Sequence, residues 1–210
     1  MIWRVRRVLT GHDADGRSTF IADGHAPNVK EMTPTFPGLA LTDLWETKGA
    51  PASNAGDADA ADRPIHLEPP KNGTIVRIVE FPPDSTRPTH ADARAGFKAI
   101  GAGHAPDRKS ADPMMHRTQT VDYIIVLKGE IYAIMETGEK LLRAGDVLIQ
   151  RGTNHSWSVR TSEPCIVAAI LVNAKPLAKK VEIRNVTTTT KKPKKRSHPP
   201  NGAGNTYQRG

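Results

Sequence analysis

The feature that most restricts how this chain can fold is a regular series of short apolar segments between residues 121 and 173. Turns fall at 128–129 and 137–138, and further breaks follow at spacings of about ten residues, which is typical of β-sandwiches and β-barrels. The series predicts strands at 121–127, 130–136, 139–143, 146–150, 155–160 and 164–173. No helix-period segment of comparable strength is present, so we expect an all-β fold.

The first half of the chain has weaker strand signals and two long loop-like segments. Strands are expected at 3–9 and 18–22 around a turn at 13–16, and at 39–46 and 74–81, the last ending at a Pro-Pro pair that would stop a strand. Residues 50–73 and 82–113 resemble loops, with 95–100 as a short element inside the second. We therefore predict three parts: N-terminal strands and loops that pack on a barrel (1–83), the barrel core (84–174) and a basic tail (175–210).

The basic charge belongs to the tail. The formal net charge is +8, but residues 175–210 hold ten Lys/Arg and one Glu, which leaves residues 1–174 at −1. We expect disorder beyond about residue 186, where the composition is polar and unpatterned. A solvated tail is the favoured interpretation, ahead of a segment that touches an anionic surface or acts as a localisation signal. The near-neutral remainder gives no electrostatic case for nucleic-acid binding.

Cysteine use and hydropathy suggest a soluble protein. Cys165 is the single cysteine and lies in an apolar run, so it is expected to be a core residue, and an intrachain disulfide is excluded. No apolar run of signal-peptide or transmembrane length is found. We expect a cytoplasmic protein without a membrane partner.

Two motifs carry a family resemblance. Residues 114–129 read MMHRTQTVDYIIVLKG, and residues 145–157 read GDVLIQRGTNHSW. Their order and spacing resemble the two conserved motifs of the cupin superfamily, and the pattern looks like a small single-domain bacterial subgroup of the cupin-2 type. Three positions depart from the usual motifs. Met114 replaces the first histidine, and Asp122 replaces the commoner glutamate, with one extra residue before it. Gln150 replaces the proline of the turn in the second motif, which is one residue shorter than usual.

The resemblance implies a double-stranded β-helix, or jelly-roll, barrel with an N-terminal β extension, and a homodimer. It also implies a metal site with His116, Asp122 and His155 as ligands. Two histidines and a carboxylate suit one divalent transition metal, such as Fe, Mn, Ni, Co or Zn. The thioether of Met114 is a poor match for such ions, so it is not expected to bind.

Geometry tests this ligand set. A continuous strand would hold His116 and Asp122 about 20 Å apart, so the chain must bend through 117–121, where Thr118 or Thr120 could support a turn. By alternation, Asp122, Ile124 and Val126 share one face of their strand, and His155, Trp157 and Val159 share one face of theirs. This is compatible with Asp122 and His155 both pointing into a barrel. Taken singly, His155 could bond to its own loop, Asp122 could pair with Arg117 or Arg151, and His116 could be exposed.

Five residues are candidates for the wall of a substrate pocket. Arg151, or Arg117, could clamp a carboxylate, but each could equally form a surface ion pair. His104 and His90 are expected to be solvated, although a lid could bring His104 to the site. The five candidates are Gln150, Arg151, Trp157, Tyr123 and Tyr132.

Three functions follow from these features. The first is a metal-dependent enzyme that acts on a small keto, carboxylate or aromatic substrate by dioxygenation, decarboxylation, or isomerisation or dehydration. The second is a non-catalytic binding or sensor protein, which would keep its ligand affinity after chelation. The third, nucleic-acid binding through the tail, requires residues 186–210.

Overall fold

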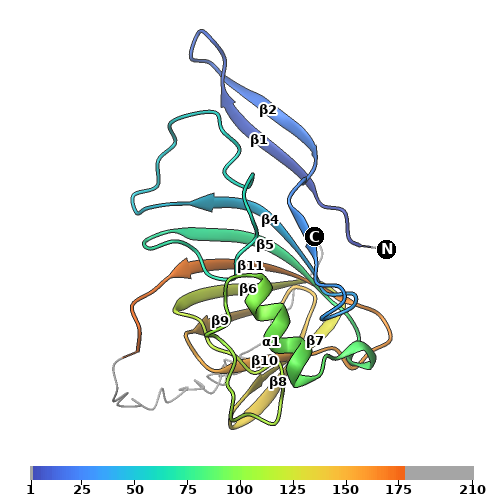
Figure 1. Ribbon diagram of the computed structural model, residues 1–210. Helices are drawn as coiled ribbons and strands as arrows, with labels where there is room; N and C mark the ends of the chain where they lie inside the picture. Colours follow the sequence, from blue (N-terminus) through green and yellow to red (C-terminus); the bar gives the residue numbers. More distant parts are fainter. Residues whose placement is uncertain (1, 178–210) are drawn as a thin grey trace, which may run out of the picture. The chain divides into compact units, whose positions relative to one another are not determined.

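The computed structural model describes residues 2–177, so the expectations for the tail beyond Leu177 lie outside the described residues. Within this range the chain is mostly β-structure, as expected (Figure 1). Its strands are β1 (Arg6–His12), β2 (Ser18–His25), β3 (Val29–Glu31), β4 (Ala40–Thr47), β5 (Thr74–Phe81), β6 (Thr120–Lys128), β7 (Glu130–Met135), β8 (Gly138–Arg143), β9 (Val147–Arg151), β10 (His155–Ser158) and β11 (Cys165–Asn173).

Two sheets enclose the core. One has the order β3-β4-β5-β11-β6-β9 and the other the order β10-β7-β8. Ile131 of the smaller sheet and Val126 and Val167 of the larger one belong to the same buried cluster. The predicted barrel is confirmed, and the six strands expected between residues 121 and 173 match β6 to β11 to within two residues.

Strand β6 places Asp122 on the face that points into the core. Its burial alternates, with Asp122, Ile124 and Val126 buried and Tyr123 and Leu127 exposed. Successive side chains of a strand point to opposite faces, so Asp122 shares the face of Ile124 and Val126. Both apolar residues are buried in the core, and Asp122 points inward with them.

The larger sheet continues across residue 83, where a boundary was expected. β5 pairs with β11 along its whole length, from Thr74 opposite Val172 to Phe81 opposite Cys165. β4 then pairs with β5. Strands from the first 83 residues are thus hydrogen-bonded members of the same sheet as β6 and β11.

The segment 82–113 contains a helix that was not predicted at its full length. The segment begins with a separate 3-10 turn, Asp84–Thr86, and helix α1 follows at His90–Ala99. The sequence had predicted only a short element at 95–100. The Oγ1 of Thr89 caps α1 by accepting a hydrogen bond from the backbone N–H of Asp92 at 3.2 Å. The helix buries Ala93, Gly96 and Phe97, a stripe too short and too poor in large apolar residues to stand out in the sequence.

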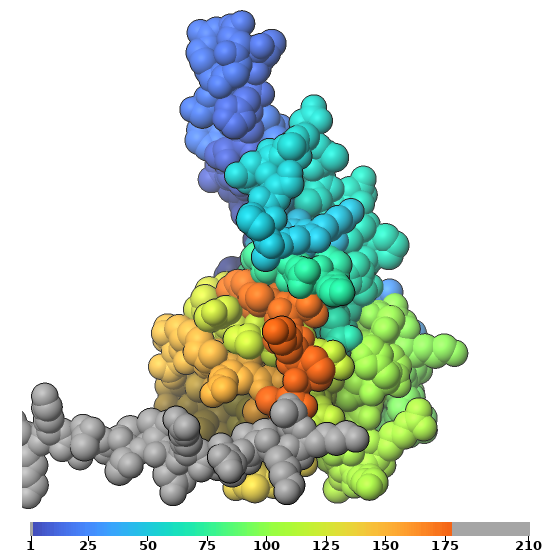
Figure 2. Space-filling model, turned by 90° about the vertical axis from the view of Figure 1, so that its left-hand side faces the viewer, coloured from blue at the N-terminus to red at the C-terminus, as the bar shows by residue number. Residues whose placement is uncertain are grey.

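The N-terminal extension is the two-stranded sheet β1–β2, whose residues are mostly exposed. Arg7 joins it to the rest of the chain, because its guanidinium pairs with Asp59 and donates to the carbonyl oxygen of Leu44 at 3.0 Å. Figure 2 shows this hairpin in blue next to the cyan segment that includes Asp59.

Two smaller expectations can be compared with the structure. Cys165 is fully buried, as predicted, and burial raises the pKa of its thiol to about 12. Among residues 2–177, no helix has the length and apolar character needed to cross a membrane.

Candidate functional site

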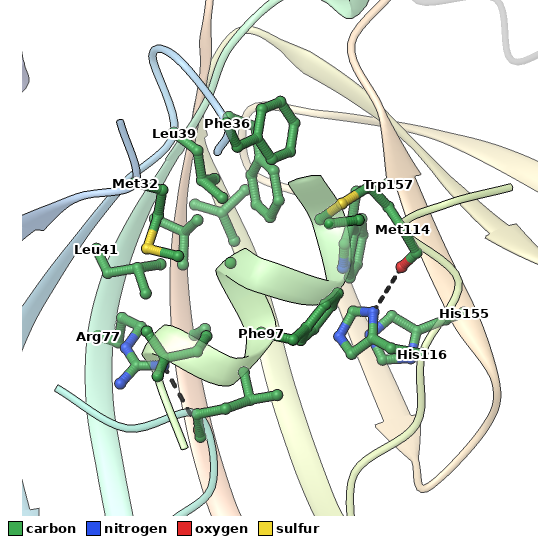
Figure 3. Close-up of a pocket in the computed structure, with 18 of the residues that line it drawn as sticks. Met32, Phe36, Leu39, Leu41, Arg77, Phe97, Met114, His116, His155 and Trp157 are labelled. Carbon is green, nitrogen blue, oxygen red and sulfur yellow. Dashed lines mark hydrogen bonds between the residues drawn. The ribbon is translucent and has the colours of Figure 1, made fainter. Parts of the chain in front are cut away.

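A cavity of about 130 Å³ lies between the larger sheet, β10 and α1. Most of its wall is apolar, and Figure 3 shows Met32, Phe36, Leu39 and Leu41 on the side away from the histidines. We call the other side, formed by His116, Asp122, Gln150 and His155, the polar end. A mostly apolar cavity with a few convergent polar groups is the usual form of a small-molecule site.

His116 and His155 meet through a backbone bridge. Each N–H donates to the other residue's carbonyl oxygen at 2.9 Å, and the centroids of the two rings lie 4.2 Å apart. The chain bends after His116, where the N–H of Arg117 bonds to the carbonyl oxygen of Ala105 at 3.1 Å. The segment between His116 and Asp122 is therefore bent. This is what the ligand hypothesis required, because an extended strand would hold the two side chains too far apart.

Both imidazoles are held in one tautomer. Nδ1 of His116 donates to the carbonyl oxygen of Met114 at 2.8 Å, and Nδ1 of His155 donates to that of Thr153 at 2.9 Å. Burial lowers the pKa of His116, and it lowers that of His155 further, with the neighbouring His116 as a second cause. The rings are therefore neutral at ordinary pH, and each has its lone pair on Nε2.

Asp122 and Gln150 complete the polar end. Each is 3% exposed, and they lie directly opposite each other in the pairing of β6 with β9. Nε2 of Gln150 donates to Oδ2 of Asp122 at 3.1 Å and to Nε2 of His155 at 2.9 Å. Burial raises the pKa of Asp122 to about 6. Oδ1 of Asp122 and Oε1 of Gln150 are buried without a hydrogen-bond partner.

The donor types of the polar end fit a divalent transition metal. Metal-binding histidines usually donate their second ring N–H to a carbonyl or carboxylate, and both rings do so here. The unpartnered Oδ1 of Asp122 is a suitable oxygen donor. Among residues 2–177, however, no three His, Cys, Asp or Glu side chains are already arranged around a common metal position. Binding through Nε2 of His155 would require the Gln150 amide to release that nitrogen.

The other pocket candidates are divided between the cavity and the surface. Gln150 and Trp157 line the cavity, and the Trp157 ring stands edge-on to that of His155 at 5.7 Å. Tyr123 is 43% exposed because it alternates with Asp122 along β6. Tyr132 stacks under the guanidinium of Arg160 at 3.8 Å, and Arg151 is exposed. These three are not among the residues that line the cavity.

The remaining candidates also have clear positions. Met114 lines the cavity. His104 is exposed and contacts Glu68 at 2.8 Å, while Arg117 and His90 are exposed as well.

Sequence reasoning missed one cavity residue near the histidines. The Phe97 ring of α1 lies 4.8 Å from that of His116 and closes this side of the cavity. The signal that could have located it is the pair Thr89 and Asp92, since a hydroxyl residue followed three positions later by an acidic one often starts a helix.

Comparison with known proteins identifies the family. No protein-family model matches the chain. The phomopsin biosynthesis cluster proteins C′ and D of Diaporthe leptostromiformis are 47% identical over 164 residues, which cover 74% of this chain and 70% of each relative. The cupin-domain-containing oxidoreductase srdB of Neurospora crassa is 30% identical over 178 residues, which cover 81% of this chain and 74% of the relative. The chain belongs to the cupin family.

The relatives of this cupin are fungal, whereas the motif pattern suggested a bacterial subgroup. Among solved structures, the Schizosaccharomyces pombe Cnp3 cupin domain is similar, with a TM-score of 0.41 at 10% identity over 81% of this chain and 89% of that one. Several relatives are named oxidoreductases, and others are named for fungal biosynthesis clusters.

Proposed function

We propose that this cupin is an enzyme that binds a small organic molecule in the cavity and transforms a keto, carboxylate or aromatic group at the polar end. One divalent transition metal, held by His116, Asp122 and His155, would assist. The observation that carries the proposal is the fixed tautomer of both imidazoles, beside an unpartnered carboxylate oxygen of Asp122. Each Nε2 carries a lone pair, and that of His155 is occupied by the Gln150 amide.

The chain's own residues supply binding and proton control. The apolar wall excludes water and orients the apolar part of a substrate towards the polar end. Without an ion, burial raises the pKa of Asp122 to about 6, so its carboxyl would lose any remaining proton when a metal binds to it. A bound metal would add polarisation of a substrate oxygen or activation of dioxygen. The oxidoreductase names of the relatives favour oxidation over decarboxylation, isomerisation or dehydration.

A second candidate is the non-catalytic binding protein. The observation in its favour is the Gln150 amide, which occupies Oδ2 of Asp122 and Nε2 of His155 without an ion. In this case a small apolar molecule would bind in the cavity, and a chelator would leave its affinity unchanged.

Metal content per chain separates the two candidates. Wild type, His155→Ala and the exposed-histidine control His104→Ala would be purified without added metal and measured by elemental mass spectrometry. We expect near-stoichiometric Fe, Mn, Ni, Co or Zn in wild type and in His104→Ala, and its loss from His155→Ala. A wild-type protein that stays empty after incubation with each of these ions would refute the metalloenzyme and leave the binding protein.

A further inference from the structure

We propose that Gln150 is a fourth donor of the metal site and that its amide turns over when the ion binds. The NH2 group that bridges Asp122 and His155 would then give way to the carbonyl oxygen Oε1. This inference rests on the proposed function, and it assigns a role to a residue outside the predicted ligand set.

The first support is the number of bonds that the Gln150 amide can make. Its nitrogen carries two N–H groups, and it contacts two acceptors, Oδ2 of Asp122 at 3.1 Å and Nε2 of His155 at 2.9 Å. Both N–H groups of the amide therefore have an acceptor, while the carbonyl oxygen Oε1 is buried without a hydrogen-bond partner. An unpaired buried carbonyl is unfavourable, so this arrangement satisfies the nitrogen of the amide and leaves the oxygen unsatisfied.

The second support is what the opposite orientation would require. Turning the amide would place Oε1 against the carboxylate of Asp122 and the lone pair of His155, both of which are acceptors. Three acceptors in contact repel one another unless a cation lies among them. The NH2 orientation thus suits the site without an ion, and the oxygen orientation suits the site with one. Neutral amide oxygen is an accepted ligand for divalent ions.

The third support is the rigidity of the position. Gln150 lies opposite Asp122 in the antiparallel register of β9 and β6, where paired side chains share one face of the sheet. After Gln150, Gly152 turns the chain with φ of +59° towards His155. Since the sheet fixes the Cα positions, only the terminal amide needs to rotate.

A purely structural Gln150 would behave differently. It would hold Asp122 and His155 together, so its loss would weaken folding and leave the affinity for an ion unchanged. The two roles are therefore separated by measuring metal affinity and stability on the same variants.

The experiment titrates Co²⁺ into the chelator-treated, dialysed full chain. Binding would be followed by the visible absorption of the bound Co²⁺ and by quenching of tryptophan fluorescence. Trp157 should report on the site, because its ring centroid lies 5.7 Å from that of His155. The variants are Gln150→Leu, Gln150→Glu and the exposed control Gln119→Glu, which adds the same charge at the surface. Urea unfolding and near-UV circular dichroism, recorded without metal, verify that each variant is folded.

We expect the Co²⁺ affinity to fall about 10-fold or more in Gln150→Leu, to rise in Gln150→Glu and to stay unchanged in Gln119→Glu. In amide NMR spectra, the Gln150 NH2 pair, assigned by its absence in Gln150→Glu, should shift when diamagnetic Zn²⁺ is added. Wild-type affinity in a folded Gln150→Leu, or an NH2 pair that Zn²⁺ leaves in place, would overturn the role of Gln150 while preserving the metal site. Absence of Co²⁺ binding by wild type itself would overturn both proposals.

Discussion

His116 and His155 exchange both of their backbone hydrogen bonds, N–H to carbonyl oxygen at 2.9 Å in each direction. His155 begins β10, but His116 belongs to no named strand and follows the loop after α1. This loop is anchored by Asp112, whose two carboxylate oxygens each accept from Nη2 of Arg87 at 2.7 Å. The spacing of the two imidazoles therefore depends on a loop that is anchored at Asp112 and at His116 itself.

The buried carboxyl of Asp122 should make stability depend on pH. In the unfolded chain its pKa is close to 4, whereas burial raises it to about 6 in the folded protein. Between these values the folded state binds more protons than the unfolded state, so this group's contribution to stability falls as the pH rises through that window. With a chelator present, Asp122→Asn should equal wild type near pH 4 and exceed it at pH 7.5 by up to about 3 kcal/mol.

Urea unfolding at several pH values measures this difference, with the exposed Asp57→Asn as the matched control. The lowered pKa values of His116 and His155 destabilise both proteins equally in acid, so they cancel from the comparison. Parallel profiles for wild type and Asp122→Asn would contradict a raised pKa.

Phe97 should be the most costly residue of α1 to truncate. It is 5% exposed and packs against the His116 ring, so Phe97→Ala removes a large apolar contact and widens the cavity. We expect a loss of about 3 kcal/mol in the free energy of unfolding, measured in urea. Lys98→Ala, on the exposed side of the same helix, should cost under about 0.5 kcal/mol. Equal costs for the two would show that α1 does not close the cavity wall.

Gly129 is expected to tolerate no side chain. Its φ is +78°, and an added Cβ would lie 3.0 Å from the carbonyl oxygen of Pro164 and 3.2 Å from Cα of Cys165. Gly129→Ala should therefore cost about 2 kcal/mol through backbone strain and crowding. Gly138→Ala is the control because a Cβ there has nothing within 4 Å. Thermal unfolding compares the two, and similar melting temperatures would argue against strain at Gly129.

The fold was predictable wherever turns and alternation acted together. The strands from β6 onward follow from glycine-containing turns and β-branched runs, and alternation places Asp122 on the same face as Ile124 and Val126. The same alternation places Tyr123 on the opposite face, where it is exposed. Helix α1 was missed in part because its buried stripe contains Ala93 and Gly96, which carry little periodic signal.

The site was only partly predictable. The ligand hypothesis required a bend after His116, but the bridge to His155 joins distant segments and depends on tertiary structure. The contact of Gln150 with both Asp122 and His155 likewise needs the pairing of β9 with β6. Whether the three predicted ligands hold a metal stays a prediction.

The pairing of β5 with β11 has a consequence for dividing the chain. Val79 of β5 and Leu41 of β4 line the same cavity as His155, so neither side of residue 83 contains the whole cavity wall. Two peptides cut at this point would each expose a strand edge that only the other can cover. The cavity would then form only when the two peptides associate, so formation of the cavity would report their association.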